Sequence, residues 1–228
     1  MGAASPAFAI ELYGDIGMGD IYARDVSRAL KAAKDASEID LRINSAGGDV
    51  FEGVAIYEAL QRFPGRVTAH VDGLAASAAS FIAMAADEIR IAPAGFIMIH
   101  PAQGLGIGPA ETMRQMADTL DKITARIAQA YSARTGVTED KALALMAAET
   151  WFDAEEAVAA GFADRLSEAP KRRIAARYDP SLHQFRNMPD AVRKLIAGAQ
   201  ESRAKDRAAS RDAYLTRARI RVNARSRL

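Results

Sequence analysis

Cysteine is absent from the 228 residues of this chain. Neither a disulfide framework nor a cysteine-ligated metal site can therefore form, which suits a reducing compartment. Aromatic residues make up only 7%, and no apolar run is long enough to span a bilayer. The opening stretch MGAASPAFAI also lacks the basic and apolar regions of a secretory signal. These absences predict a cytoplasmic protein that does not enter a membrane.

The net charge is only +1, but the charges are distributed unevenly. From Lys171 onward the chain holds 16 Lys and Arg against 5 Asp and Glu, which leaves 14 basic and 24 acidic residues before it. This reversal near Pro170 predicts a domain over 1–168 and a basic tail over 169–228. Because the tail has few bulky apolar residues, we expect it to be partly helical or disordered. Its arginines suit an acidic partner or a nucleic acid.

Within the domain, strand-like and helix-like segments alternate. Short segments with alternating or continuous apolar residues indicate strands at AIELYGDIG, EIDLRIN, RVTAHVDG, EIRIAP and GFIMIH. Apolar residues on one helical face indicate helices, among them one with Ile21, Val26, Leu30 and Ala33, and a second with Val50, Val54, Tyr57 and Leu60. The glycine-rich stretch SAGGD is predicted to be the turn before the second helix. This order of segments predicts an α/β fold.

The longest predicted helix covers Pro109–Arg134, with proline in the first turn and Gly136 after its end. An apolar stripe runs along it through Met113, Met116, Leu120, Ile123 and Ile127. At helical rise the rod would be about 39 Å long, more than a compact domain of this size needs internally. The length favours projection toward another subunit, and a stripe facing the core of the same domain is the alternative.

Small residues dominate the first half of the segment GLAASAASFIAMAADEI, where Ser77 stands at the head of a predicted helix. A serine hydroxyl becomes a useful nucleophile only when a base takes its proton. The chain has three histidines, His70, His100 and His183. His100 is favoured as the base because it ends an apolar strand, where functional side chains commonly project. The alternatives are a packing role for the serine and a structural role for the histidine.

Acyl transfer also requires N–H donors for the developing oxyanion. The adjacent glycines of SAGGD follow a strand and can present bare backbone N–H groups to a substrate. An ordinary strand-to-helix turn is the alternative interpretation. Small residues around Ser77 would let both a substrate and a neighbouring backbone come close to it.

Four stretches in order resemble the successive motifs of ClpP-type serine peptidases, and specifically those of phage head-maturation proteases: INSAGGDVFEGVAIYEALQ, GLAASAASFIAMAA, IMIHPAQG and TWFDAEEAVAAGFAD. The resemblance covers Ile10 to Leu166. It implies a ClpP/crotonase-type fold of repeated β-β-α units, a projecting handle helix at Pro109–Arg134, and a charged C-terminal extension outside the match. In the family this handle joins two rings, usually heptamers, and no cofactor or metal takes part.

The resemblance places the nucleophile on Ser77, the general base on His100, and the oxyanion-hole amides on Gly48 and Ala78. The third triad member falls on Glu149, where ClpP itself has aspartate. Glutamate can also accept the imidazole N–H, although its extra methylene requires a shifted backbone or a different rotamer.

Asp153 is the alternative third triad member. It is also predicted to cap the next helix, with Glu156 three residues on. A charged side chain that serves as a helix cap is less available to orient a histidine, so the sequence favours Glu149.

The leading hypothesis is a self-compartmentalising, ATP-independent serine endopeptidase that processes capsid or scaffold proteins in phage heads. Its peptide groove would be bordered by Gly47–Val50 and Gly104–Gly108. The alternatives are a catalytically inactive ClpP-like ring or scaffold protein, and a crotonase-type acyl-CoA enzyme, a class that needs no Ser–His pair. On the leading hypothesis, the endopeptidase would act in the host cytoplasm or the prohead.

Overall fold

The computed structural model describes residues 8–19, 21–168 and 185–193. By its contacts the chain divides into two compact units, Met1–Met188 and Pro189–Leu228. The boundary predicted after residue 168 stays a prediction, because residues 169–184 lie outside the described residues. Of the predicted tail, residues 190–193 are helical. The part from residue 194 onward also lies outside the described residues. No helix in the described ranges has the length and apolarity to cross a bilayer.

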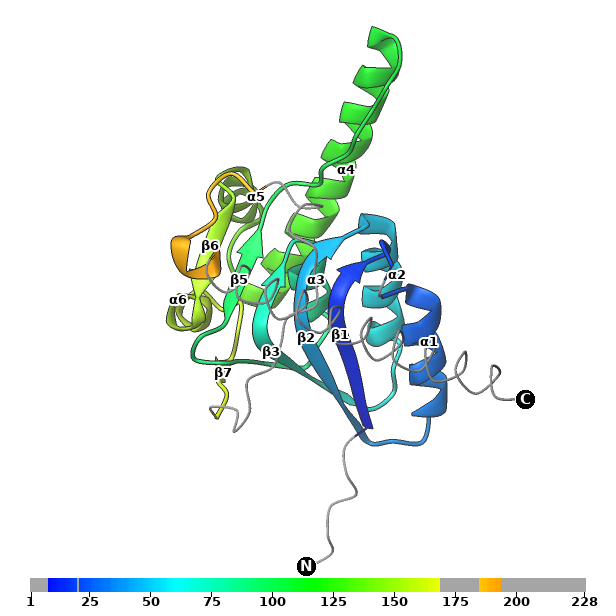
Figure 1. Ribbon diagram of the computed structural model, residues 1–228, viewed down its shortest axis with the longest axis vertical. Coiled ribbons are helices and arrows are strands. Elements are labelled where there is room, and N and C mark those ends of the chain that lie inside the picture. The colour runs from blue at the N-terminus through cyan, green and yellow to red at the C-terminus, as the bar shows by residue number, and fades with distance from the viewer. Residues whose placement is uncertain (1–7, 20, 169–184, 194–228) are drawn as a thin grey trace, which may run out of the picture. The chain divides into compact units, whose positions relative to one another are not determined.

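A seven-stranded sheet forms the centre of the first unit (Figure 1). Its main path runs through β1 (Phe8–Ile16), β2 (Glu38–Gly48), β3 (Arg66–Ala76), β4 (Glu88–Ile91) and β7 (Arg165–Leu166), all paired in parallel. A side branch consists of β5 (Phe96–Ile99), parallel to β3, and β6 (Thr150–Asp153), antiparallel to β5. The predicted α/β class is therefore confirmed.

The helices are α1 (Ala23–Ala32), α2 (Val50–Gln61), α3 (Ala78–Ala83), α4 (Ala110–Thr135), α5 (Glu139–Ala147) and α6 (Ala154–Ala159). Figure 1 shows α1 and α2 side by side next to β1 and β2. The predicted apolar face of the first helix is confirmed at Val26 and Leu30, which are buried in the core. Ile21 and Ala33 are buried too but lie outside the helix, Ile21 in an isolated bridge with Ile16 and Ala33 at the C-cap. Burial of this stripe against the sheet is what holds an otherwise polar helix in place.

The predicted turn at SAGGD is wrong, because β2 continues through Gly48. Ser45 pairs with Ala75 on β3, and Gly48 pairs with Ile16 on β1. The last two residues of β2 have positive φ angles, 100° at Gly47 and 145° at Gly48. Glycine tolerates these angles, and both residues still pair with β1.

The second helix bears out most of the predicted face, because Leu60 is buried and Val50 and Tyr57 pack against the core, whereas Val54 is exposed. The pattern missed Gly53 and Ile56, which are buried as well. A Cβ atom placed on Gly53 would lie 3.2 Å from the Cβ of Ala78. The helix therefore approaches α3 most closely at a glycine, which a pattern of bulky apolar residues does not reveal.

Only part of the segment from Gly73 to Ile89 is helical. Its first four residues end β3, and α3 then occupies six residues, all of them buried. The small side chains thus serve a strand-to-helix junction that neighbouring backbones approach closely, as the contact between Gly53 and Ala78 shows.

Helix α4 extends well beyond the sheet (Figure 1). Pro109 caps it, and Gly136 ends it in the left-handed conformation with φ 78°. The predicted stripe is fully buried only at Ile127, while its other members are partly exposed. Met116, a member of this stripe, lies against the loop that precedes α4, since a Cβ placed on Gly104 would lie 2.3 Å from Cε of Met116.

Candidate active site

Ser77 occupies the junction between β3 and α3 with φ 53° and ψ −124°. Its N–H donates to the carbonyl of Met98 on β5 at 3.0 Å. A non-glycine residue pays a steric cost for positive φ, so the surrounding strands must hold the turn in this conformation. The turn places the serine side chain at the carboxyl end of β3 rather than within the core.

The side chains of Ser77 and His100 meet at this edge of the sheet. Serine Oγ lies 2.6 Å from Nε2 of the imidazole. The reason is the parallel pairing of β3 with β5, in which Ala76 is the partner of Met98, so the residues that follow the two strands are neighbours. A hydroxyl at this distance can pass its proton to the imidazole as it attacks a carbonyl carbon.

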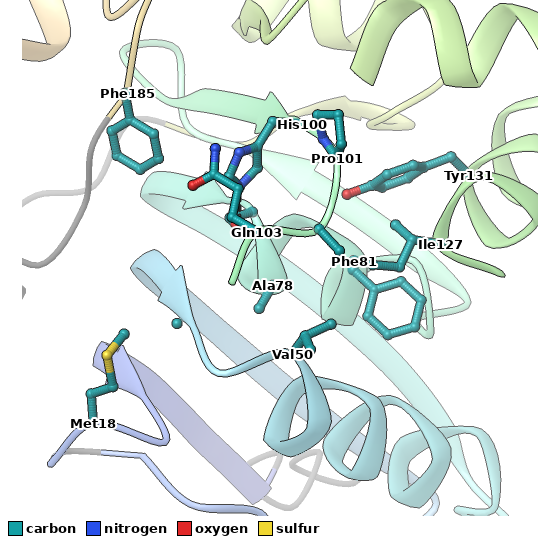
Figure 2. A pocket seen from close by; sticks show the side chains of 13 residues that line it. Met18, Val50, Ala78, Phe81, His100, Pro101, Gln103, Ile127, Tyr131 and Phe185 are labelled. Atoms are coloured by element: carbon teal, nitrogen blue, oxygen red, sulfur yellow. Dashed lines mark hydrogen bonds between the residues drawn. The ribbon is translucent and has the colours of Figure 1, made fainter. Parts of the chain in front are cut away.

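A cleft of about 180 Å³ opens beside this pair. Figure 2 shows Phe81, Ile127 and Tyr131 on one side of it and Phe185 on the other, beyond His100. One wall is thus apolar, and the hydroxyl and imidazole stand next to it. Burial raises the pKa of the Tyr131 hydroxyl, which therefore stays protonated.

Two further residues that line the same cleft come from different elements, Gly48 from β2 and Ala78 from α3. A Cβ on Gly47 would lie 2.7 Å from Cβ of Ser77, and one on Gly48 would lie 2.0 Å from the carbonyl oxygen of Ile16. Only glycine lets this backbone pass so close to the serine. Ala78 is the first residue of α3, where N–H groups have no partner within the helix.

Glu149 is buried, with a relative exposure of 2%, between α5 and β6. Its Oε1 accepts hydrogen bonds from the N–H of Asn187 at 2.7 Å and from Nε1 of Trp151 at 3.3 Å. Its Oε2 accepts from the N–H of Arg186 at 2.9 Å. Within the described part of the chain these are its hydrogen-bond donors, and the imidazole of His100 is not among them.

The carboxyl of Glu149 nevertheless stays ionised. Burial acts to raise its pKa, but the N–H groups of Asn187 and Arg186, the Trp151 indole and the nearby His100 lower it, and the net shift is downward. Hydrogen bonds to a carboxylate favour its charged form. A negative charge is therefore held in the interior close enough to His100 to interact with it electrostatically.

Strand register separates Glu149 from Asp153. Antiparallel pairing sets Thr150 opposite Ile99, the neighbour of His100, and sets Asp153 opposite Phe96 at the other end of β5. The prediction that Asp153 caps a helix is confirmed, since its carboxylate accepts from the N–H of Glu156 at 2.9 Å in a capping box. Of the two acids, Glu149 is the one adjacent to the histidine end of the strand.

The remaining predicted candidates lie elsewhere. His70 pairs with Asp40 across β2 and β3, at 2.8 Å between Nε2 and Oδ1, and His183 lies outside the described residues. In the described ranges no three His, Asp or Glu side chains are grouped closely enough to hold a metal ion.

The sequence analysis missed the residues around the acid. Trp151 bonds to Glu149, and the ring of Phe185 makes edge contacts with both Trp151 and His100, at 5.3 and 6.1 Å between ring centroids. Phe185 is one of the few aromatic residues of the predicted tail, where it stands among polar residues, and this isolation is the one signal in the sequence.

Comparisons with known proteins identify relatives of this chain. The Clp protease family model matches residues 10–170. The ATP-dependent Clp protease proteolytic subunit 1 of Leifsonia xyli subsp. xyli is 33% identical over 143 residues, which cover 61% of this chain and 73% of the relative. The ATP-dependent Clp protease proteolytic subunit of Chlorella vulgaris is 33% identical over 140 residues, covering 60% and 70%.

A solved structure shares the fold. A ClpP1 mutant from Listeria monocytogenes aligns with a TM-score of 0.64 and 25% identity, over 71% of this chain and 91% of that protein. The predicted ClpP-like architecture with its long helix is thereby confirmed. Because the family match spans the strands, the serine–histidine pair and the glycine-bordered cleft, we conclude that the chain belongs to the Clp protease family and is a serine peptidase.

Proposed function

We propose that this peptidase cleaves peptide bonds through an acyl-enzyme, with Ser77 as nucleophile, His100 as general base and Glu149 as the acid of the triad. The amides of Gly48 and Ala78 would donate to the oxyanion. The observation that carries the proposal is the 2.6 Å contact between Ser77 Oγ and His100 Nε2 in a cleft that Gly48 and Ala78 also line.

In the first half of the reaction, Oγ of Ser77 attacks the scissile carbonyl carbon while its proton moves to Nε2 of His100. The amides of Gly48 and Ala78 stabilise the negative charge on the carbonyl oxygen. When the carbon–nitrogen bond breaks, the imidazolium gives its proton to the leaving amine. In the second half, water attacks the acyl carbon while His100 takes its proton; the ester bond to Oγ of Ser77 then breaks, the imidazolium returns the proton to Oγ, and the acid product leaves.

Glu149 would stabilise the imidazolium that forms in both halves. Its pKa is lowered, so the carboxylate carries a charge at neutral pH and favours a cation nearby.

The proposed enzyme works as a closed homo-oligomer, most simply stacked heptameric rings joined through α4. Support comes from the projection of α4 and from the apolar residues beside it, Leu105 and Ile107, which are 93% and 92% exposed. Enclosing the cleft in a ring protects folded proteins from a nucleophile whose substrate is bound mainly through its extended backbone. The groove would run between Gly47–Val50 and Gly104–Gly108.

The proposed substrates are capsid or scaffold proteins of a phage head, processed without an ATPase in the host cytoplasm or the prohead. The support is the resemblance of the four motifs to phage head-maturation proteases. A tail rich in arginine adds to it, because such a tail suits docking on an acidic capsid protein or on nucleic acid. Coexpression with candidate capsid proteins, read by intact mass beside Ser77→Ala, tests this assignment.

Labelling with a fluorophosphonate probe tests the chemistry. Peptide mapping should find the phosphonyl group on Ser77, and both Ser77→Ala and His100→Ala should abolish it. His70→Gln is the matched control, because this histidine pairs with Asp40 outside the cleft and its loss should leave labelling intact. An inactive scaffold or an acyl-CoA enzyme would show no label on Ser77 in the wild-type protein.

A further inference from the structure

The segment Phe185–Asn187 contacts the buried acid although it lies beyond the range matched by the family, residues 10–170. Two consecutive backbone N–H groups of this segment, those of Arg186 and Asn187, each bond a different oxygen of Glu149. Two successive amides that bind one carboxylate form a small anion-binding concavity. Here the bound anion is the chain's own Glu149 carboxylate.

Side chains fasten the same segment to the turn that carries the acid. Nδ2 of Asn187 donates to the carbonyl of Ala148 at 2.8 Å, and Nη2 of Arg186 donates to the carbonyl of Ala147 at 3.2 Å. Both acceptors lie at the end of α5, directly before Glu149. The segment thus binds the backbone that precedes Glu149 as well as the Glu149 carboxylate. These contacts restrain a residue whose φ is 50°.

The hydrogen bonds leave the carboxylate able to accept one more. An ionised carboxylate offers about four acceptor positions. Oε1 uses two of them, for Trp151 and Asn187, whereas Oε2 uses one, for Arg186. Nε of Arg186 approaches Oε2 only to 3.7 Å, an ion-pair distance rather than a hydrogen bond. One acceptor position of Oε2 therefore takes no donor from the described residues.

Phe185 links the same segment to the base. Its ring meets the rings of His100 and Trp151 edge to face, at interplanar angles of 75° and 88°. Aromatic pairs favour this arrangement, and a ring wedged between two others limits the rotation of each. Figure 2 shows Phe185 beside His100 at the border of the cleft.

We propose that Phe185–Asn187 is a positioning element of the active site, in which the amides of Arg186 and Asn187 hold the Glu149 carboxylate and the Phe185 ring holds the His100 imidazole. This inference rests on the proposed function. It makes catalysis depend on a stretch that the family match does not include. A merely structural role, in which the segment covers the α5–β6 turn, is the competing account.

Removal of one amide in the full-length chain separates the two accounts. Asn187→Pro deletes the N–H that bonds Oε1 and should lower kcat for a fluorogenic peptide by about 10-fold or more, with a much smaller change in KM. Asn187→Ala keeps that N–H and should lose less. Asp190→Pro is the matched control, since proline at the first residue of a helical turn costs little.

The decisive measurement is a double-mutant cycle with Glu149→Gln. If the amide acts through the carboxylate, Asn187→Pro should change kcat by less than about 2-fold once Glu149 is glutamine. Equal factors in both backgrounds would overturn the positioning role. Urea unfolding of each variant shows whether the fold is retained.

Phe185 supplies a second route if Asn187→Pro does not fold. Phe185→Ala should lower kcat by about 10-fold, and Phe185→Leu, which keeps an apolar contact with the imidazole, should restore part of it. Unchanged kcat in Phe185→Ala would refute its part of the proposal. Both outcomes differ from failure of the proposed function, in which Ser77 of the wild-type protein would take no fluorophosphonate label.

Discussion

Ser77 and Glu149 are the two non-glycine residues of the described chain with positive φ, at 53° and 50°. One carries the hydroxyl beside His100, and the other carries the carboxylate that interacts with the same histidine. Backbone strain of this kind persists only where surrounding structure holds it, and it concentrates at functional sites. Both ends of the proposed triad thus lie on strained backbone.

The strain at Ser77 predicts that glycine at this position gives a more stable protein than alanine, the reverse of the order expected within a helix. Ser77→Gly should unfold at a higher urea concentration than Ser77→Ala, by about 1 kcal/mol in the free energy of unfolding, because glycine adopts positive φ without a steric cost. Both variants lack the nucleophile, so activity cannot influence the comparison. Ser80, which lies in α3, is the control, and there glycine should be the less stable variant. The same order at both positions would contradict strain at Ser77.

Gly47→Ala should slow fluorophosphonate labelling by about 100-fold or more, since the new Cβ would press on the nucleophile and disturb the oxyanion amides. That atom would stand 2.7 Å from both Cβ of Ser77 and the carbonyl oxygen of Ala76. Gly19→Ala is matched to it, with φ 135° but no atom within 4 Å of the added Cβ. Gly19→Ala should lower the free energy of unfolding, while the rate of fluorophosphonate labelling changes only a few-fold. Comparable labelling rates for the two variants would refute the steric argument.

A buried hydroxyl pair ties α3 to α4. Oγ of Ser80 lies 2.9 Å from the hydroxyl of Tyr131 and also donates toward the carbonyls of Ser77 and Met98. Tyr131→Phe should lower the free energy of unfolding by about 1 kcal/mol, because Ser80 keeps its carbonyl partners. Chemical denaturation measures this value. A loss several times larger would mean that the hydroxyl of Tyr131 does more than satisfy Ser80.

The depressed pKa of Glu149 predicts a pH-dependent contribution to stability. The free energy that its ionisation adds is fully present above the ordinary glutamate pKa of about 4.3 and is lost as pH falls through the lower folded value. The advantage of the wild-type protein over Glu149→Gln should therefore be largest near neutral pH and shrink below about pH 4. Urea unfolding at several pH values tests this, and an advantage that grew on acidification would contradict it.

Charges beside the handle helix should disrupt the proposed double ring. Leu105→Asp and Ile107→Asp together place two carboxylates at positions that are 93% and 92% exposed in the protomer. We expect dissociation into smaller species, seen by native mass spectrometry, with an unchanged circular dichroism spectrum. Phe51→Asp, at a 65% exposed residue of α2, is the control for a charge placed elsewhere. Intact assemblies in the double variant would refute assembly through α4.

Sequence patterns alone indicated the α/β class, most strand segments and the long helix, because each depends on local periodicity. The resemblance of the motifs named Ser77 and His100, and the parallel pairing of β3 with β5 brings the two together. The extent of β2 was mispredicted, because Gly47 and Gly48 allow positive φ within a strand. In α2 the apolar pattern missed Gly53, which is buried where the helix approaches α3.

The environment of the acid was decided by tertiary structure alone. The sequence could name Glu149 and Asp153 as alternatives, but strand register set one beside the histidine end of β5 and the other at its far end. The amides of Arg186 and Asn187 reach the carboxylate from 37 and 38 positions away. Backbone N–H groups are identical at nearly every residue, so no side-chain pattern marks the two that folding brings to a buried charge.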